Sequence, residues 1–163
     1  MKKIILLVGK SGTGKTHIIN SLCLRKVVPY TTRPMREGEI DGISYNFITK
    51  EECENTVVDD IVAATNFDGH TYFAKKDSLK DKEVYVVDPS GVHYYLAMIE
   101  LESNLPMPVI VYLEAPWYRR LYRIMKREGF SLESLKIAIR RLRNDRKKFG
   151  KLEGQFPYST IRT

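Results

Sequence analysis

The chain has 163 residues, of which 43% are hydrophobic and 29% are charged, and its formal net charge is +7. This length and composition predict one globular domain with a substantial core, and no apolar run reaches the roughly 20 residues that a membrane-spanning helix needs. The excess of basic residues favours a polyanionic ligand, without deciding between a nucleotide and a nucleic acid. Two cysteines without metal-ligand spacing, Cys23 and Cys53, predict a reduced protein of the cytoplasm.

The first predicted element is a buried strand. Residues 4–8 form an uninterrupted apolar run, which is typical of a parallel strand that is covered on both faces. The following residues 9–16 fit the pattern G-x-x-x-x-G-K-[ST], and residues 16–24 can form an amphipathic helix. A strand, a glycine-rich loop and a helix in this order predict a phosphate-binding P-loop rather than a turn that binds nothing.

In such a loop the glycines allow successive backbone N–H groups to point at phosphate oxygens. Lys15 would bring a positive charge to the outer phosphates, and Thr16 would offer a hydroxyl group to Mg²⁺. The expected phosphate-binding residues are Gly9, Lys10, Ser11, Gly12, Thr13, Gly14, Lys15 and Thr16.

The next segment with a chemical signal is residues 30–39. Pro34 and Gly38 predict an irregular loop, in which Arg33 and Arg36 are three residues apart. Arginine forks bind phosphate oxygens bidentately, so a fixed pair of arginines can act as a phosphate clamp. On composition alone, a solvated loop with two surface arginines is the favoured interpretation.

Residues 31–47, TTRPMREGEIDGISYNF, resemble the substrate-binding signature of guanylate kinases, T-T-R-x-x-R-x-G-E-x-x-G-x-x-Y-x-F. The signature follows the P-loop at the distance usual in that family, and the resemblance extends from residue 4 to about residue 160. It implies an α/β fold, namely a P-loop three-layer sandwich with a parallel sheet. It also implies a core of about residues 1–32 and 83–163, an acceptor-binding subdomain of about residues 33–82 and a helical lid of about residues 123–141.

The resemblance also assigns roles to residues. Arg33, Arg36 and Tyr45 would hold the monophosphate of an acceptor nucleotide, and Glu39 would brace the arginines. Tyr72 would be a second tyrosine on that phosphate, because residues 67–72 resemble the family pattern F-x-G-N-x-Y.

Three positions around the acceptor base depart from the family pattern. Ala63 stands where a glutamate reads guanine, while Pro29 and Ala74 stand where the family has serines. A site that leaves guanine donors unpaired would lose selectivity, so another base is an open alternative. A carboxylate could also come from elsewhere if the local path differs, and the candidates are Asp59, Asp60 and Asp68.

The middle of the chain contains several predicted elements. Residues 49–52 form a capping box that should open a short helix ending near residue 54, and a helical turn and a strand are predicted over residues 57–67. Residues 83–88 read as a second buried strand that ends in Asp88. This acid could orient Mg²⁺ or its bound water, could lie near the acceptor base as the resemblance implies, or could cap the next helix.

The C-terminal half alternates helix and strand, which predicts βαβ units. We expect a helix over residues 91–101, a strand over 109–113, a helix from about residue 116, another from residue 131, and a last strand over 156–161. The helix from residue 131 should bury one apolar stripe, which consists of Leu135, Ile139, Leu142 and Phe149. Its solvated basic face should hold Arg143, Arg146, Lys147 and Lys148.

Two of these helices resemble the lid of the family, in which arginines surround the transferred phosphoryl group. Arg127 and one of the pair Arg140 and Arg141 are therefore expected to act with Lys15 in catalysis. The favoured hypothesis is an ATP-dependent kinase that uses Mg²⁺ and phosphorylates GMP or dGMP. Its partners would be ATP and a nucleoside monophosphate, with no membrane and no nucleic acid, and it would be a monomer or a weak dimer.

Three alternatives remain at this point. The first is a kinase for another nucleoside monophosphate, and the second is a non-catalytic binding module, although such modules usually lose P-loop residues that are retained here. The third is a kinase or ATPase acting on nucleic acid, which the basic helices suggest.

Overall fold

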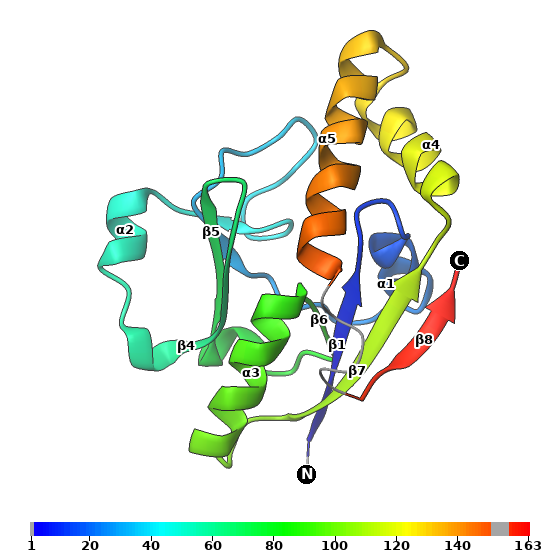
Figure 1. The fold of residues 1–163 in the computed structure, drawn as a ribbon. Coiled ribbons are helices and arrows are strands. Elements are labelled where there is room, and N and C mark those ends of the chain that lie inside the picture. Colours follow the sequence, from blue (N-terminus) through cyan, green and yellow to red (C-terminus); the bar gives the residue numbers. More distant parts are fainter. Residues whose placement is uncertain (1, 151–156) are drawn as a thin grey trace.

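The computed structural model describes residues 2–150 and 157–163, and Figure 1 shows their arrangement. One sheet has the strand order β6-β1-β7-β8 and is parallel throughout. Its strands are β1 (Lys3–Gly9), β6 (Val84–Val86), β7 (Met107–Glu114) and β8 (Ser159–Arg162). The predicted buried strands are thus confirmed, and β1 lies between β6 and β7.

Both faces of β1 are covered, which explains the absence of polar alternation in its sequence. Ile4, Leu6 and Val8 pack in the larger core with helix α3 (Pro89–Leu101). Leu7 points to the opposite face and packs with Ile19 of helix α1 (Lys15–Ser21). The two layers of helices on a parallel sheet give the expected three-layer sandwich.

Several predicted helices differ at their ends. Helix α1 ends at Ser21 rather than near residue 24, and Cys23 just beyond it adopts a left-handed φ of 50°. Helix α3 begins at Pro89, two residues earlier than expected, because Asp88 caps it by accepting a hydrogen bond of 2.8 Å from the Gly91 N–H.

The second sheet has the order β3-β2-β5-β4 and packs beside α3. It comprises β2 (Tyr30–Thr31), β3 (Asn46–Phe47), β4 (Ile61–Phe67) and β5 (His70–Lys75). Strand β2 falls within the range 1–32 that was expected to belong to the core. Strands β4 and β5 form a hairpin whose turn residues, Asp68 and Gly69, both have positive φ.

Short helical segments border this sheet. Helix α2 (Lys50–Glu54) begins with the predicted capping box, which is confirmed because Thr49 and Glu52 exchange side-chain and backbone hydrogen bonds. Two 3₁₀ turns, η1 (Val58–Asp60) and η2 (Lys76–Leu79), precede β4 and follow β5.

Helices α4 (Trp117–Glu128) and α5 (Leu132–Phe149) form a hairpin that rises above the parallel sheet (Figure 1). The prediction for the buried side of α5 was wrong except at Phe149, since Ile139 is exposed and Leu135 and Leu142 are only partly buried. The residues that α5 buries are instead Ser134, Ala138, Asp145 and Phe149. The helix is therefore rotated toward its polar side, where it meets α4 and the P-loop.

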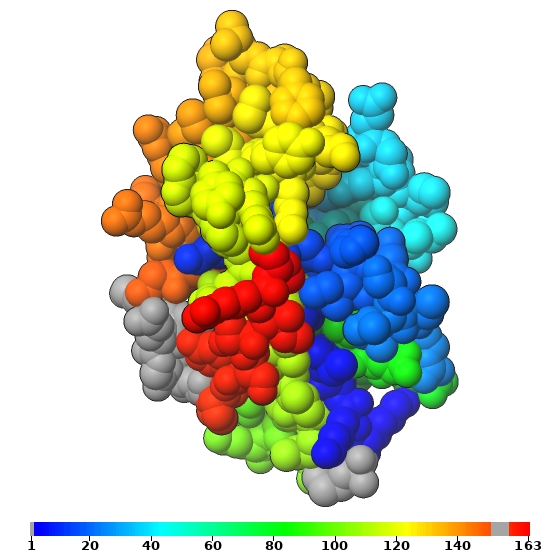
Figure 2. Space-filling model, turned by 90° about the vertical axis from the view of Figure 1, so that its right-hand side faces the viewer, coloured from blue at the N-terminus to red at the C-terminus, as the bar shows by residue number. Residues whose placement is uncertain are grey.

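The end of the chain lies close to this hairpin. Figure 2 shows β8, in red, directly beneath α4, in yellow. The part of the predicted last strand at Phe156 lies outside the described residues. Among residues 2–150 and 157–163, no helix is both long enough and apolar enough to cross a membrane.

Candidate active site

One cavity of about 570 Å³ lies between the P-loop, the second sheet and the α4–α5 hairpin. Sequence segments far apart in the chain meet there, because parallel strands β1 and β6 both end at this edge of the sheet. The predicted site residues that line the cavity are Gly9, Ser11, Gly12, Gly14, Lys15, Thr16, Arg33, Arg36, Tyr45, Tyr72, Asp88, Arg127 and Arg141.

The P-loop follows β1 and wraps around the side chain of Lys15. The Lys15 ammonium donates hydrogen bonds to the carbonyl oxygens of Gly9, at 2.5 Å, and Lys10, at 3.0 Å. Thr13 is buried and its hydroxyl donates to the Lys10 carbonyl at 2.8 Å. The side chain of Lys15 is thus folded back along the backbone of the loop.

Burial lowers the pKa of Lys15 to about 8. The nearby carboxylate of Asp145 opposes this shift, while the positive charges of Arg120 and Arg127 add to it. An anionic ligand at the loop would raise this pKa again, because it favours the charged form of the lysine.

A buried ion pair between helices α4 and α5 holds the P-loop at Ser11. Arg120 of α4 and Asp145 of α5 contact each other, and their side chains are 7% and 5% exposed. Asp145 accepts hydrogen bonds from the backbone N–H of Ser11, at 2.9 Å, and from its hydroxyl group, at 3.2 Å. Arg120 donates to the Ser11 carbonyl at 2.8 Å. Every hydrogen-bonding group of Ser11 is therefore held by this pair.

Sequence reasoning missed this pair. Arg120 lies on the helix predicted from about residue 116, where nothing in the sequence distinguishes it from the neighbouring arginines, and Asp145 lies among the basic residues that are predicted to face solvent. The available signal was that Asp145 is the sole acidic residue between residues 140 and 148.

Arg123, at the start of the expected lid of about residues 123–141, also contacts the P-loop. Its guanidinium donates to the Gly12 carbonyl and to the Thr163 hydroxyl, both at 3.2 Å. Thr163 in turn donates to the Thr13 carbonyl at 2.8 Å. Arg123 of helix α4 and Thr163 thus hold the loop at Gly12 and Thr13, in addition to the contacts at Ser11.

The expected acceptor clamp forms a compact cluster on the other side of the cavity. Arg33 is 7% exposed, and its guanidinium donates to Glu39 at 2.8 Å. The same carboxylate accepts the backbone N–H of Arg36 at 2.9 Å. Arg33 also lies over the Tyr45 ring, 5.3 Å from its centre, and the rings of Tyr45 and Tyr72 meet edge to face. Arg33, Tyr45 and Tyr72 therefore form a fixed arginine–tyrosine cluster, whereas the Arg36 side chain is exposed and lines the same cavity.

Burial, followed by the neighbouring Tyr72 hydroxyl, raises the pKa of Tyr45. Its hydroxyl group therefore stays protonated near neutral pH and can donate a hydrogen bond to a phosphate oxygen.

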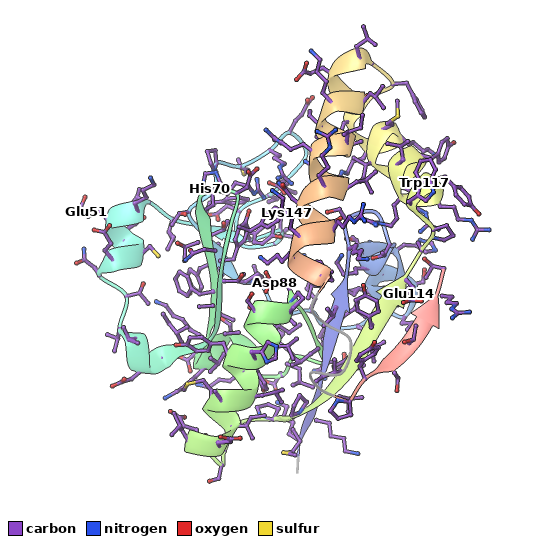
Figure 3. All side chains as sticks on the ribbon, in the orientation of Figure 1. Glu51, His70, Asp88, Glu114, Trp117 and Lys147 are labelled. Carbon is purple, nitrogen blue, oxygen red and sulfur yellow. The ribbon has the colours of Figure 1, made fainter. Side chains whose placement is uncertain are left out.

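Asp88 has more partners than its role as a helix cap requires. Its carboxylate forms an ion pair with Lys148 of α5 and accepts the Thr65 hydroxyl at 2.7 Å. Figure 3 shows Asp88 at the start of α3, facing the end of α5. The assignment of Lys148 to a solvated helical face is wrong, because its side chain is 17% exposed and lines the cavity. The other three basic residues assigned to that face, Arg143, Arg146 and Lys147, are exposed.

The three positions that depart from the family pattern lie in two places. Ala63 and Ala74 face each other across β4 and β5 and are fully buried in the core. Pro29 lines the cavity. The alternative carboxylates lie elsewhere, since Asp59 and Asp60 are exposed in η1 and Asp68 occupies the hairpin turn.

The expected catalytic arginines are divided between the cavity and the surface. Arg141 lines the cavity and donates to Glu128 at 2.8 Å, and Arg127 contacts the same carboxylate at 3.2 Å. Arg140 is not among the lining residues; it is 65% exposed and lies 3.9 Å from Asp68. Of the Arg140 and Arg141 pair, only Arg141 lines the cavity.

The residues present fit a magnesium ion that is held mainly by substrate phosphates and water. Among the described residues, no three His, Cys, Asp or Glu side chains gather as a metal site. The exposed Thr16 lines the cavity and could hold the ion through its hydroxyl group. Asp88 fits this role less well, because its carboxylate already pairs with the Lys148 ammonium, whose positive charge disfavours a second cation there.

Comparisons with known proteins agree with this geometry. A guanylate kinase from Frankia casuarinae is 30% identical over 145 residues, covering 85% of this chain and 78% of that protein. One from Mesoplasma florum is 34% identical over 87 residues, covering 49% of this chain and 29% of that protein. The crystal structure of guanylate kinase from Anaplasma phagocytophilum has the same fold, with a TM-score of 0.64 and 22% identity over 99% of this chain and 77% of that one.

The family model for guanylate kinase matches residues 1–161, so the match includes the P-loop, the arginine–tyrosine cluster and the α4–α5 hairpin. Because this match extends over nearly the whole chain, and because the fold and the two halves of the cavity agree with it, the chain belongs to the guanylate kinase family.

Proposed function

We propose that this protein transfers the γ-phosphoryl group of ATP to the monophosphate of GMP or dGMP. The observation that carries the proposal is the single cavity, which the P-loop lines on one side and Arg33, Arg36, Tyr45 and Tyr72 line on the other. Two sets of phosphate-binding residues in one cavity suit transfer of a phosphoryl group between two phosphates better than hydrolysis of one nucleotide. Membership of the guanylate kinase family supports the same reaction.

In this proposal ATP lies on residues 9–16, and its outer phosphates attract Lys15 away from the carbonyls that now hold it. The acceptor phosphate lies on the arginine–tyrosine cluster. Its own oxygen attacks the γ-phosphorus while the bond to the β-phosphate oxygen breaks, so no general base is needed. Thr16 is the residue that would hold Mg²⁺, which when bound would neutralise charge on the ATP phosphates.

The tip of the α4–α5 hairpin is the proposed lid, within about residues 123–141. Glu128 holds Arg127 and Arg141 together at the cavity wall. Closure would bring these two arginines to the transferred phosphoryl group, where they stabilise its charge and exclude water. Arg140 would stay outside, so we assign it no catalytic role.

The proposal keeps the division into a core, an acceptor-binding subdomain and this lid. It also keeps ATP and a nucleoside monophosphate as the binding partners, with a monomer or weak dimer as the working form. A cytoplasmic location is part of it, since Cys23 and Cys53 are both free thiols.

A coupled assay for nucleoside diphosphate formation tests the proposal across GMP, dGMP and the other common monophosphates. We expect Mg-ATP-dependent turnover with GMP or dGMP, and loss of turnover by roughly 100-fold or more in Lys15→Met. Lys147→Met is the matched control, because Lys147 is exposed and does not line the cavity. Absence of turnover with every monophosphate would refute the proposal and would favour a non-catalytic binding module.

A further inference from the structure

The side chain of Lys148 occupies the acceptor side of the cavity. Its ammonium contacts the Asp88 carboxylate, the Thr65 hydroxyl at 3.0 Å and the Asn66 carbonyl at 3.4 Å. It also lies over the ring of Phe67, 4.7 Å from the ring centre. We call Lys148, Asp88 and Thr65 the base cluster, for the reason that follows.

The base cluster lies beside the proposed phosphate clamp. Thr65 of β4 is directly opposite Tyr72 of β5 in the strand register, and partners in an antiparallel pair are about 5 Å apart. Both residues line the same cavity as Asp88 and Lys148. A nucleotide whose phosphate contacts Tyr72 therefore has its base within reach of this cluster.

The cluster has hydrogen-bonding capacity to spare. A lysine ammonium has three protons, and the contact of Lys148 with the Asn66 carbonyl is the longest of its three contacts. A base carbonyl could replace that contact. Asp88 uses one oxygen for the Gly91 N–H and the other for both Thr65 and Lys148. Of the roughly four acceptor sites of a carboxylate, one therefore remains for a further N–H group, on the oxygen that accepts from Gly91.

We infer that the base cluster is the specificity-determining site for the acceptor base, an inference that rests on the proposed function. Lys148 donates to a ring carbonyl, and Asp88 accepts the adjacent ring N–H. This pair fits a base with a lactam edge, which is the C6=O and N1–H of guanine and of hypoxanthine. Adenine presents the reverse order, with an amino donor facing the ammonium and an unprotonated nitrogen facing the carboxylate.

The 2-amino group of guanine has less to contact. Among residues 2–150 and 157–163, the carboxylates that line the cavity are Asp88 and Asp145, and Asp145 is already bonded to Arg120 and Ser11. Ala63 is packed in the core. A base that lacks the 2-amino group but keeps the lactam edge should therefore bind nearly as well as guanine.

Calorimetric binding of GMP, IMP and AMP without ATP tests the inference, because it needs no turnover. With the unmodified protein, IMP should bind within about tenfold of GMP, and AMP about 100-fold more weakly, since one uncompensated pair of buried polar groups has this effect. Lys148→Met should weaken GMP and IMP by about tenfold or more and AMP by less than about threefold. Lys147→Met, on the exposed side of the same helix, should change none of the three affinities.

A purely structural role for Lys148 predicts a different result. In that case Lys148→Met lowers the melting temperature and weakens all three nucleotides equally, which would overturn the inference. If this variant fails to fold, Thr65→Val and the comparison of IMP with AMP in the unmodified protein still test the inference. Equal binding of IMP and AMP would contradict recognition of a lactam edge. An inactive protein that binds GMP and IMP but not AMP would refute the kinase proposal alone, and an active kinase without this selectivity would refute the inference alone.

Discussion

Arg120 and Asp145 form a buried ion pair that joins helices α4 and α5 beneath the P-loop. Both residues also hydrogen-bond to Ser11, so the pair fixes the backbone of the loop as well as the packing of the two helices. The same helix α5 carries Lys148 one turn later, on the acceptor side of the cavity. One turn of α5 therefore contacts both the donor loop and the proposed base site, which links their relative positions.

Asp145→Asn should both destabilise the protein and weaken ATP. Removal of one partner leaves the buried Arg120 charge without its counter-charge, a change that costs about 3–5 kcal/mol at buried pairs. Urea unfolding should report this loss, and the KM for ATP should rise because Ser11 loses a charged acceptor. Glu133→Gln on the same helix is the control, since Glu133 is exposed and lies 3.7 Å from the exposed Lys136.

The double variant Arg120→Met with Asp145→Leu separates the two effects. An apolar pair of similar volume often leaves stability unchanged or raises it. The KM for ATP should nevertheless remain high, because neither new side chain can bond to Ser11. A double variant with unchanged stability and an unchanged KM would show that the pair does not position the loop.

ATP affinity should fall as the pH rises above about 8, because the pKa of Lys15 lies at about 8 in the free protein. Below this pH the lysine is already charged, and binding needs no proton. Above it, bound phosphates must first recruit a proton to the lysine, so apparent affinity declines with increasing pH. Calorimetry near pH 9, in two buffers of different ionisation enthalpy, should show proton uptake with the unmodified protein and less uptake with Lys15→Met. Equal proton uptake in both proteins would contradict the assignment.

The sequence alone predicts those features that depend on residues close together along the chain. The P-loop, the strands of the parallel sheet and the capping box of α2 all follow from local patterns. The sequence could not predict which face of α5 is buried, because two different rotations of the helix both give an amphipathic pattern. The docking of the α4–α5 hairpin decides this, and it turns Asp145 and Lys148 inward.

The base-reading positions show the same limit. Counting from the family motif identified Ala63 and Ala74 as departures, but it could not show that both face the core. Lys148 is more than 70 residues from either in sequence, and only the tertiary fold brings it to Thr65. Sequence reasoning therefore located the missing base contact without finding its replacement.

Glu39→Gln should weaken acceptor binding and leave ATP binding unchanged. Glu39 bridges the Arg33 guanidinium and the Arg36 backbone, so a neutral amide would lose the charge-assisted bond to Arg33. The KM for the acceptor nucleotide should rise about tenfold, which corresponds to about 1.4 kcal/mol. Glu37→Gln, two residues earlier and exposed, serves as the control. A rise in the KM for ATP of similar size would mean that Glu39 affects the whole cavity.

Gly12→Ala should disrupt the P-loop far more than Gly69→Ala disrupts its hairpin, although both glycines have nearly the same φ, 77° and 78°. The cost of a positive φ, about 1–2 kcal/mol for a residue with a side chain, is common to the two variants. At Gly12 a Cβ atom would also lie 2.8 Å from the Arg120 carbonyl oxygen, whereas at Gly69 nothing lies within 4 Å. The backbone of α4 cannot yield without moving Arg120 away from Ser11. Calorimetric titration with ATP should thus show little or no binding to Gly12→Ala and near-normal binding to Gly69→Ala, and equal losses in both would mean that the close approach of α4 does not constrain the loop.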